Sequence, residues 1–471
     1  MDINNITAVY FVGAGGIGMS ALIRYFLSKG KRVAGYDKTP STLTGELERE
    51  GVALHYEDSV SLIPDSFTHP ADTLVVYTPA VPETHSELCY FRRNGFEVMK
   101  RARVLGMITG CSRGLCVAGT HGKTTTSSML AHLLKQSHVD CSAFLGGILK
   151  NYNSNLMLSD SSDLTVVEAD EFDRSFHWLT PYMAVITSAD PDHLDIYGTP
   201  EAYRESFEHF TSLVRPDGCL IMKQGIRVTP RLQEGAALYT YTGILQPGEL
   251  PVETPDFYAE NLCIGDGDIF FDFVGPDVRI PDIQLGVPVK VNVENGVAAI
   301  ALAWLNGVTP EEIKRGMATF AGPRRRFDFH LKTENIVLID DYAHHAAELK
   351  ASILSVKELY VGRKVTGIFQ PHLYTRTRDF AVDFASSLSL LDELILLDIY
   401  PAREAPIPGV TSQIILDAVT ISNKRLIHKE ELLDVLAAEA DKLEVVLMVG
   451  AGNIELLVEP VKQILDKKNK S

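Results

Sequence analysis

The stretch GLCVAGTHGKTTTSSMLAHLLKQ, residues 114–136, decides the fold of the chain around it. A short apolar strand leads into a glycine-rich turn. A helix follows, and the spacing of Met129, Leu130, Leu133 and Leu134 predicts one buried face. A strand, a glycine turn and a helix in this order are typical of an α/β domain with a parallel sheet.

The turn GTHGKTTT predicts a phosphate-binding loop. Its glycines let backbone N–H groups point at phosphate oxygens, and the helix that follows adds its positive end. Lys123 suits the β- and γ-phosphates, and the Thr124 hydroxyl suits Mg²⁺. General P-loop proteins would carry glycine at position 117, where Val117 stands, so this loop is a shortened form. The residues predicted to bind ATP here are Gly119, Thr120, His121, Gly122, Lys123, Thr124 and Thr125.

Acidic residues end the next two apolar strands, LTVVEADE and AVITSAD. Parallel sheets bind their ligands at the carboxyl ends of the strands. Carboxylates and an imidazole beside phosphates are the groups that a divalent metal needs. The sequence therefore predicts an ATP·Mg²⁺ site that includes some of Glu168, Asp170, Glu171, Asp190, Asp192 and His193.

A second glycine turn, GAGGIGMS, begins at Gly13 and follows another apolar strand. Gly13, Gly15 and Gly18 fit the dinucleotide pattern GxGxxG, and Asp37 stands 24 residues after Gly13, where a ribose-binding acid belongs. Taken alone, this turn favours a nicotinamide dinucleotide. A lone pattern of this kind is weak evidence.

The 471 residues are enough for about three domains. The strand–helix rhythm predicts an α/β fold with Rossmann-like domains at both ends, 1–107 and 323–471, around a central P-loop-type domain, 108–322. A net charge of −17 argues against a broad nucleic-acid-binding surface. No apolar run is long enough to predict a membrane span. Six cysteines without a CxxC pair indicate a reducing cytoplasm.

Nine motifs in the chain together resemble the Mur ligases of peptidoglycan synthesis, over almost the whole length. In order they are GAGGIGMS, GTHGKTTT, VEADEFDRSF, DHLD, NVEN, RRRFD, DDYAHH, FQPHLYTRTRD and VGAGNIE. The resemblance implies that ATP phosphorylates a carboxylate of a UDP-linked sugar, and that an amino acid then attacks the acyl phosphate. The implied substrates are UDP-N-acetylmuramate and L-alanine, with ATP and two Mg²⁺ ions as cofactors. A segment without lysine, YGTPEAYRESFEHF, favours the alanine-adding branch, because sister ligases use a carbamylated lysine there.

The resemblance also implies roles for single residues. Thr124 binds one Mg²⁺, and Glu168 and His193 bind the second. Beyond the phosphate loop, ATP would contact Asn292, Asn295, Arg326, Asp341 and Tyr342. The amino acid would be held by His344 and His372 with Arg376 or Arg378, between which the sequence does not decide. The UDP end would lie on Gly13, Ala14, Gly15, Gly16, Ile17, Gly18, Asp37, Thr78, Ala80 and Val81.

Some positions depart from the family pattern, and some alternatives stay open. Val291 stands where a histidine is common, Ala346 replaces a proline, and the loop 78–87 is unusual. A ligase that recycles the murein tripeptide is the nearest alternative. An NAD(P)-dependent oxidoreductase and a regulatory P-loop ATPase are alternatives from other classes. The chain is expected to be a monomer or homodimer, with a hinge near Gly322.

Overall fold

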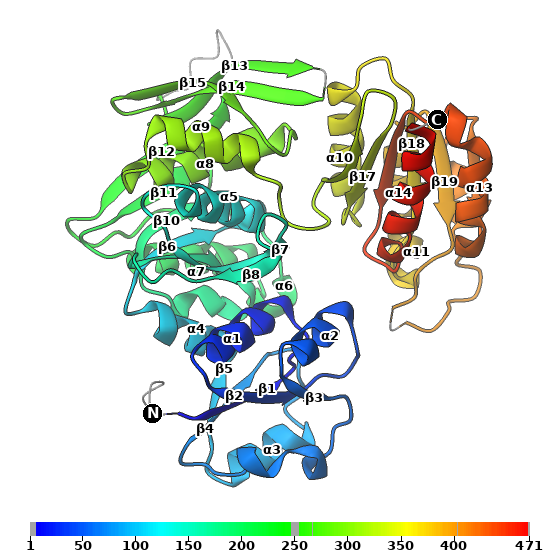
Figure 1. Ribbon diagram of the computed structural model, residues 1–471. Helices are drawn as coiled ribbons and strands as arrows, with labels where there is room; N and C mark the ends of the chain where they lie inside the picture. The colour runs from blue at the N-terminus through cyan, green and yellow to red at the C-terminus, as the bar shows by residue number, and fades with distance from the viewer. Residues whose placement is uncertain (1–5, 246–253, 266, 403, 470–471) are drawn as a thin grey trace. The chain divides into compact units, whose positions relative to one another are not determined.

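The computed structural model describes residues 6–245, 254–265, 267–402 and 404–469, except for the side chains of 195, 468 and 469. Three sheets follow one another along these residues, each covered by helices (Figure 1). The chain divides into two compact units, each built from more than one segment. The first comprises Met1–Glu260, Asp272–Pro281 and Glu294–Thr319, and the second Asn261–Phe271, Asp282–Val293 and Phe320–Ser471.

The first sheet is parallel throughout and has the strand order β3-β2-β1-β4-β5. The order reverses between β1 and β4, which is where open α/β sheets form a ligand crevice. Helices α1, α2 and α4 cover one face and α3 the other (Figure 1). The elements are β1 (Ala8–Val12), α1 (Ile17–Ser28), β2 (Arg32–Tyr36), α2 (Thr42–Arg49), β3 (Ala53–His55), β4 (Thr73–Tyr77), α3 (Ser86–Arg93), β5 (Glu97–Lys100) and α4 (Arg101–Thr109).

The second sheet has ten strands, in the order β15-β14-β13-β12-β11-β10-β6-β9-β7-β8. Its centre, with β6 between β9 and β10, is parallel and carries the phosphate loop. The strands are β6 (Arg113–Ala118), β7 (Ser142–Leu149), β8 (Ser154–Met157), β9 (Leu164–Ala169), β10 (Pro181–Ile186), β11 (Cys219–Lys223), β12 (Ala237–Ile244), β13 (Phe257–Gly265), β14 (Asp268–Gly275) and β15 (Val278–Gln284). The helices are α5 (Lys123–Lys135), α6 (Leu194–Tyr197), α7 (Pro200–Ser212), α8 (Val291–Leu305) and α9 (Pro310–Thr319).

The four apolar residues predicted to share one face of α5 are all fully buried, and the burial extends beyond that face to every side of the helix. Every residue from Thr126 to Leu134 is buried. The cause is tertiary: β7 and β9 pack on α5 from the sheet, and α9 also packs against it. The polar His132 is tolerated there because its two ring nitrogens lie 3.0 Å from the Tyr152 hydroxyl and 3.0 Å from the Thr319 hydroxyl.

The first two sheets share one apolar core. A single cluster of buried side chains includes Phe11 and Phe26 of the first sheet layer and Phe144 and Phe207 of the second. Tyr25 and Phe144 meet with ring centroids 5.7 Å apart. The apolar core is therefore continuous between the first sheet and the second. The domain boundaries at 107/108 and 322/323 stay predictions.

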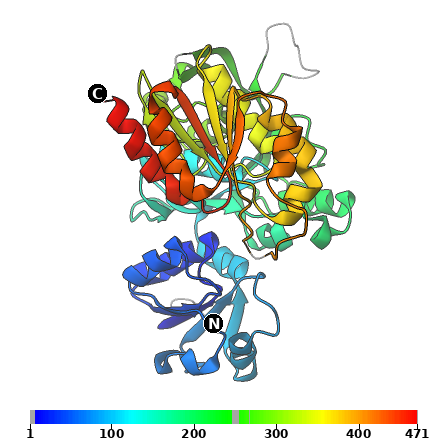
Figure 2. The same cartoon turned by 90° about the vertical axis from the view of Figure 1, so that its right-hand side faces the viewer.

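The third sheet has six strands, in the order β16-β17-β21-β18-β19-β20, and only its β16 edge is antiparallel. Figure 2 shows this sheet between its helices, with α13 and α14 on one face and α10 and α11 on the other. The elements are β16 (Asp328–Lys332), β17 (Val337–Asp341), α10 (Ala346–Leu359), β18 (Val365–Phe369), α11 (Tyr374–Leu388), β19 (Glu393–Leu397), α12 (Gln413–Ala418), β20 (Lys424–Ile427), α13 (Leu432–Glu439), β21 (Val445–Val449) and α14 (Glu455–Asn469). The predicted α/β class is confirmed, and the structure builds it from three sheets. Among the described residues, no helix has the length and apolar character to cross a bilayer.

Candidate active site

The phosphate loop joins β6 to α5 and depends on two glycines with positive φ. Gly119 has φ +143° and Gly122 has φ +81°, a backbone region that other residues rarely adopt. A Cβ on Gly119 would collide with the Thr187 hydroxyl, and one on Gly122 would lie 2.7 Å from Asn295 Oδ1. The loop therefore has a tightly fixed path along the carboxyl ends of the central strands.

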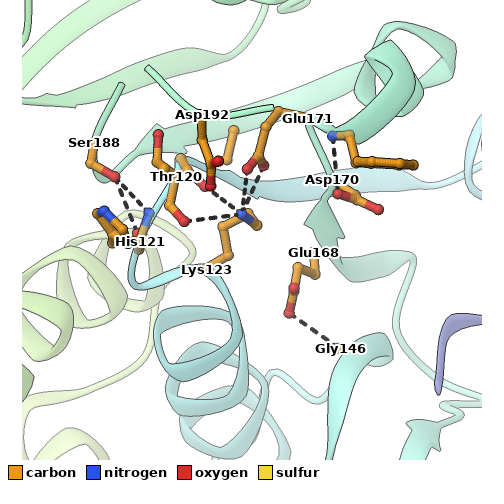
Figure 3. Close-up of polar contacts among 12 residues, drawn as sticks. Thr120, His121, Lys123, Gly146, Glu168, Asp170, Glu171, Ser188 and Asp192 are labelled. Carbon is orange, nitrogen blue, oxygen red and sulfur yellow. Dashed lines mark hydrogen bonds and ion pairs between the residues drawn. The ribbon is translucent and has the colours of Figure 1, made fainter. Parts of the chain in front are cut away.

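Lys123 lies curled back onto its own loop (Figure 3). Its Nζ donates to the Gly119 carbonyl at 2.6 Å and forms an ion pair with the Glu171 carboxylate at 2.7 Å. Glu171 is 2% exposed, and burial raises its pKa while Lys123 opposes that rise. The sequence placed Glu171 among candidate metal groups, but in this structure it neutralises the lysine. A phosphate that binds to the loop would compete with the Glu171 carboxylate for the Lys123 ammonium group.

Glu168 lies at the end of β9, directly beside the first turn of α5. The Thr124 hydroxyl donates to Glu168 Oε1 at 3.1 Å. The Gly146 backbone N–H donates to Oε2 at 3.2 Å (Figure 3). A Cβ on Gly146 would collide with the carboxylate, so the approach of this strand is close. The structure thus brings together two of the three predicted Mg²⁺ ligands.

The third predicted ligand, His193, begins helix α6 with a left-handed backbone, φ +52°. Its ring packs edge-on against Phe172, with centroids 5.1 Å apart, and its Nε2 lies 3.7 Å from Asp192. In the part of the chain that the structure describes, no three His, Cys, Asp or Glu side chains converge as a metal cage. Thr124 and Glu168 fit Mg²⁺, since this ion takes few protein oxygens and completes its shell with phosphates and water.

Polar groups that the sequence did not single out fix the phosphate loop from the β10 side. The Thr120 hydroxyl bonds to the Asp190 carbonyl and to the Tyr203 hydroxyl, both at 2.7 Å. The His121 backbone N–H donates to the Ser188 hydroxyl at 2.7 Å. The sequence could have predicted this contact, because Ser188 lies in AVITSAD at the carboxyl end of a parallel strand. No local pattern could have predicted the contact of Tyr203, which comes from helix α7 farther along the chain.

The two predicted nucleotide asparagines are both buried, Asn292 at 7% and Asn295 at 6% exposure. Asn295 Oδ1 accepts from the Thr126 hydroxyl at 3.3 Å and lies against Gly122. Asn292 Nδ2 donates to the Val287 carbonyl at 3.2 Å. Asn295 is therefore part of the phosphate-loop structure, while the Asn292 amide supports the segment that precedes α8.

The glycine turn of the first sheet gathers most of the residues predicted for the UDP end. Gly13 has φ +93°, and a Cβ there would collide with Thr78 and lie 3.1 Å from Val81. The Gly15 backbone N–H donates to Asp37 Oδ2 at 2.7 Å. Strands β1, β2 and β4 thus deliver these groups to one end of the sheet. Of the rest, Ala14 is buried, Gly16 caps α1, Ile17 and Gly18 open that helix, and Ala80 is exposed.

In the third sheet layer, three of the four predicted amino-acid-binding residues lie together. The rings of His344 and His372 have centroids 6.3 Å apart, and Arg376 Nη1 lies 3.5 Å from His372 Nδ1. Burial lowers the pKa of His344 and of His372. Arg378 instead faces outward, 53% exposed, and pairs with Asp379 at 2.7 Å. This geometry favours Arg376 over Arg378 as the carboxylate-binding arginine.

Arg325, the middle one of the three successive arginines, makes several structural contacts. It has φ +60°, forms ion pairs with Asp340 at 3.3 Å and Glu455 at 2.9 Å, and lies over the Tyr342 ring at 5.0 Å. Arg326, the one predicted to contact ATP, is exposed.

The two aspartates at the end of β17 are held in different ways. The Asp341 side chain accepts from the Ser352 hydroxyl, and burial raises its pKa. The neighbouring Asp340 is 1% exposed, and this burial raises its pKa to about 7.

The chain belongs to the Mur ligase family. The Mur ligase family catalytic domain matches residues 8–111, the Mur ligase middle domain 117–303, and the Mur ligase glutamate ligase domain 325–452. A protein of Parabacteroides distasonis is 78% identical over 468 residues, with 99% of each chain covered, and one of Phocaeicola vulgatus is 62% identical over 469 residues, covering 99% of this chain and all of the other. Both are named UDP-N-acetylmuramate–L-alanine ligase. The crystal structure of the UDP-N-acetylmuramate–alanine ligase MurC of Thermotoga maritima is also similar, at TM-score 0.79 and 26% identity over 98% of this chain and 99% of that one.

Proposed function

We propose that this chain joins L-alanine to the lactyl carboxylate of UDP-N-acetylmuramate at the expense of ATP, in the synthesis of peptidoglycan precursors. The observation that carries the proposal is the contact of Thr124 with Glu168 beside Lys123, on a loop built for phosphate. The choice of substrates is supported by relatives of that name at 78% and 62% identity. The recycling ligase is not favoured, because the murein peptide ligase of Psychrobacter arcticus is only 20% identical and supports the fold alone.

The reaction needs activation because a carboxylate is a poor electrophile. A carboxylate oxygen attacks the γ-phosphorus of ATP, the bond from phosphorus to the bridging oxygen breaks, and ADP leaves. The amine of L-alanine then attacks the carbonyl carbon of the acyl phosphate and loses a proton. The tetrahedral intermediate expels phosphate and leaves the amide. Positive groups that bring these anions together supply most of the catalysis.

We assign the ATP phosphates to the backbone N–H groups of 119–125 and to Lys123. The fixed loop path supports this assignment, because preorganised donors need no rearrangement when charge develops. Mg²⁺, when bound, would neutralise the phosphate oxygens and polarise the phosphorus. We propose Thr124 for one ion and Glu168 with His193 for the second. The adenosine end and the transferred phosphate are assigned to Asn292, Asn295, Arg326, Asp341 and Tyr342, with Gly322 as hinge.

We assign the diphosphate and uridine to the first glycine turn, where the positive end of α1 meets the Asp37 and Thr78 loops. This turn would otherwise suit a nicotinamide dinucleotide. The reaction takes place in the cytoplasm, a proposal supported by six cysteines that are all free thiols. Monomer and homodimer are both compatible with these assignments.

Arg376 and Arg378 form a matched pair for testing the L-alanine site. Arg376→Ala should raise the KM for L-alanine at least about tenfold, because a charge-assisted bond to the amino-acid carboxylate is lost. Arg378→Ala should leave it within about twofold, since Arg378 is exposed and paired with Asp379. Initial-rate measurements at saturating ATP and UDP-sugar decide between them. A larger effect at Arg378 would reverse the assignment.

Phosphate release from ATP tests the whole function, with UDP-N-acetylmuramate present and amine donors varied one at a time. We expect release that needs both the UDP-sugar and L-alanine, with the amide product seen by mass spectrometry. Release only with the murein tripeptide would establish the recycling ligase instead. Release that needs no amine would reject ligation and leave an ATPase. Hydride transfer to NAD(P)⁺ without ATP would establish an oxidoreductase.

A further inference from the structure

Arg101 lies between the glycine turn of the first sheet and the acidic loop that follows β9. It is the first residue of α4, directly after β5, at the carboxyl edge of the first sheet. Its Nη2 donates to Asp170 Oδ2 at 3.0 Å. Its Nη1 faces Gly18, where a Cβ would lie 2.5 Å from that nitrogen. One side chain therefore reaches both the candidate diphosphate site and the loop of the ATP site.

The positive side chains at the start of α4 are unfavourable for that helix. Lys100 caps α4, Arg101 and Arg103 stand in its first turn, and that turn has no acidic residue. Cations at a helix N-terminus are unfavourable, because the free N–H groups there are already positive. The compensating anions come from the next domain: Asp170 pairs with Arg101, and Asp173 with Lys100 at 2.7 Å. Arg101 forms no other hydrogen bond with any described residue, so Nη1 is available to an anion on the glycine turn.

Asp170 also fixes the loop that it belongs to. Its Oδ1 accepts from the Phe172 backbone N–H at 3.1 Å, and its carbonyl accepts from Phe176 N–H at 2.9 Å. It stands between Glu168, the partner of Thr124, and Glu171, the partner of Lys123. A shift of Asp170 would therefore be transmitted to both carboxylates at the phosphate loop.

We propose that Arg101 is a positioning residue that couples the two nucleotide sites. Nη1 binds the diphosphate of the UDP-sugar while Nη2 keeps Asp170, which the rigid fork of a guanidinium allows and an ammonium does not. Binding of the UDP-sugar holds Asp170 in place, and with it the segment 168–171 at the end of β9, and so raises the affinity for Mg·ATP. By linkage, Mg·ATP raises the affinity for the UDP-sugar by the same factor. This inference rests on the proposed function, because it needs a diphosphate on the glycine turn.

The coupling is measured on the full chain by titration calorimetry with β,γ-methylene-ATP and Mg²⁺, with and without saturating UDP-N-acetylmuramate. In the wild type, the UDP-sugar should tighten the ATP analogue about fivefold or more. Asp170→Asn should abolish this gain and leave UDP-sugar affinity within about threefold. Arg101→Ala should abolish the gain and weaken UDP-sugar binding at least about tenfold. Arg101→Lys should retain part of the affinity without the coupling.

Arg103→Ala is the matched control, because Arg103 stands in the same turn but lies over the Trp178 ring, 5.8 Å from its centroid. It should behave as the wild type. Unchanged melting temperatures show that the variants fold. The inference is overturned if the wild type shows no coupling, if Asp170→Asn keeps it, or if Arg101→Ala binds the UDP-sugar normally. A wild type that does not bind UDP-N-acetylmuramate at all rejects the proposed function itself.

Discussion

Lys123→Ala is expected to lower kcat for ligation about 10³-fold or more, while UDP-N-acetylmuramate affinity changes by less than about threefold. The loss is expected to be large because Lys123 is the cation that we propose to bind the ATP phosphates and to support the charge that grows as the phosphoryl group transfers. The UDP-sugar is spared because its proposed site is the glycine turn at the end of a different sheet. Stopped-flow or steady-state rates measure the first quantity, and calorimetry with UDP-N-acetylmuramate measures the second.

The control for this variant concerns Glu171. Without Lys123, a carboxylate at 2% exposure loses its cation, which raises its pKa further. When folding raises the pKa of a carboxyl group, the folded protein is most stable at a pH where that group is protonated. The free energy of unfolding of Lys123→Ala should therefore fall as the pH rises above the ordinary pKa of glutamate. Lys123→Ala combined with Glu171→Gln removes that charge. It should regain stability and remain inactive. A double variant that regains activity would show that the lysine acts only on folding.

Glu168→Gln is expected to have the second largest effect. It should raise the Mg²⁺ concentration for half-maximal rate at least about tenfold and lower kcat about 10²-fold. Glutamine keeps the length of the side chain. Its one carbonyl oxygen can still accept from the Gly146 N–H, and its NH₂ group can donate to the Thr124 hydroxyl, so the change removes mainly a negative charge. Rates as a function of free Mg²⁺, at fixed ATP, give both quantities.

His193→Ala should also raise the Mg²⁺ requirement, but by less, because an imidazole brings no negative charge to the ion and this one is one-third exposed. Ser188→Ala gives a reference for the general cost of disturbing the loop, since Ser188 bonds His121 N–H and is not a proposed metal ligand. Equal Mg²⁺ curves for the wild type and Glu168→Gln would remove Glu168 from the metal site. A flat response at His193 alone would leave Glu168 as the carboxylate ligand and remove His193.

Local sequence predicted those parts of the site that local geometry builds. Short patterns at strand ends predicted the glycines with positive φ at 119 and 122, the lysine that follows them, and Glu168 in LTVVEADE. These patterns work because parallel strands must deliver their carboxyl ends to one edge. The same rule brought Asp37 and Thr78 to the first glycine turn.

Contacts between distant segments were beyond that reasoning. The sequence offers three adjacent arginines, and only the fold shows that Arg325, with φ +60°, turns toward Asp340 and Glu455 while Arg326 is exposed. The burial of Ser127 and Ser128 in α5 likewise depends on elements that pack around that helix. Periodicity reports the apolar face of a helix and carries no information about a second layer over its polar face.

Gly122 and Asn295 limit how this enzyme can change over evolution or in the laboratory. A side chain at 122 would strain a left-handed backbone and displace the Asn295 amide, which also accepts from Thr126. A smaller residue at 295 would make room, but it would remove the amide proposed to contact the nucleotide. Each single step is expected to impair the enzyme, so a mutational path away from this pair is expected to cross an impaired intermediate. The two positions are therefore expected to be inherited together, although they lie far apart in the chain.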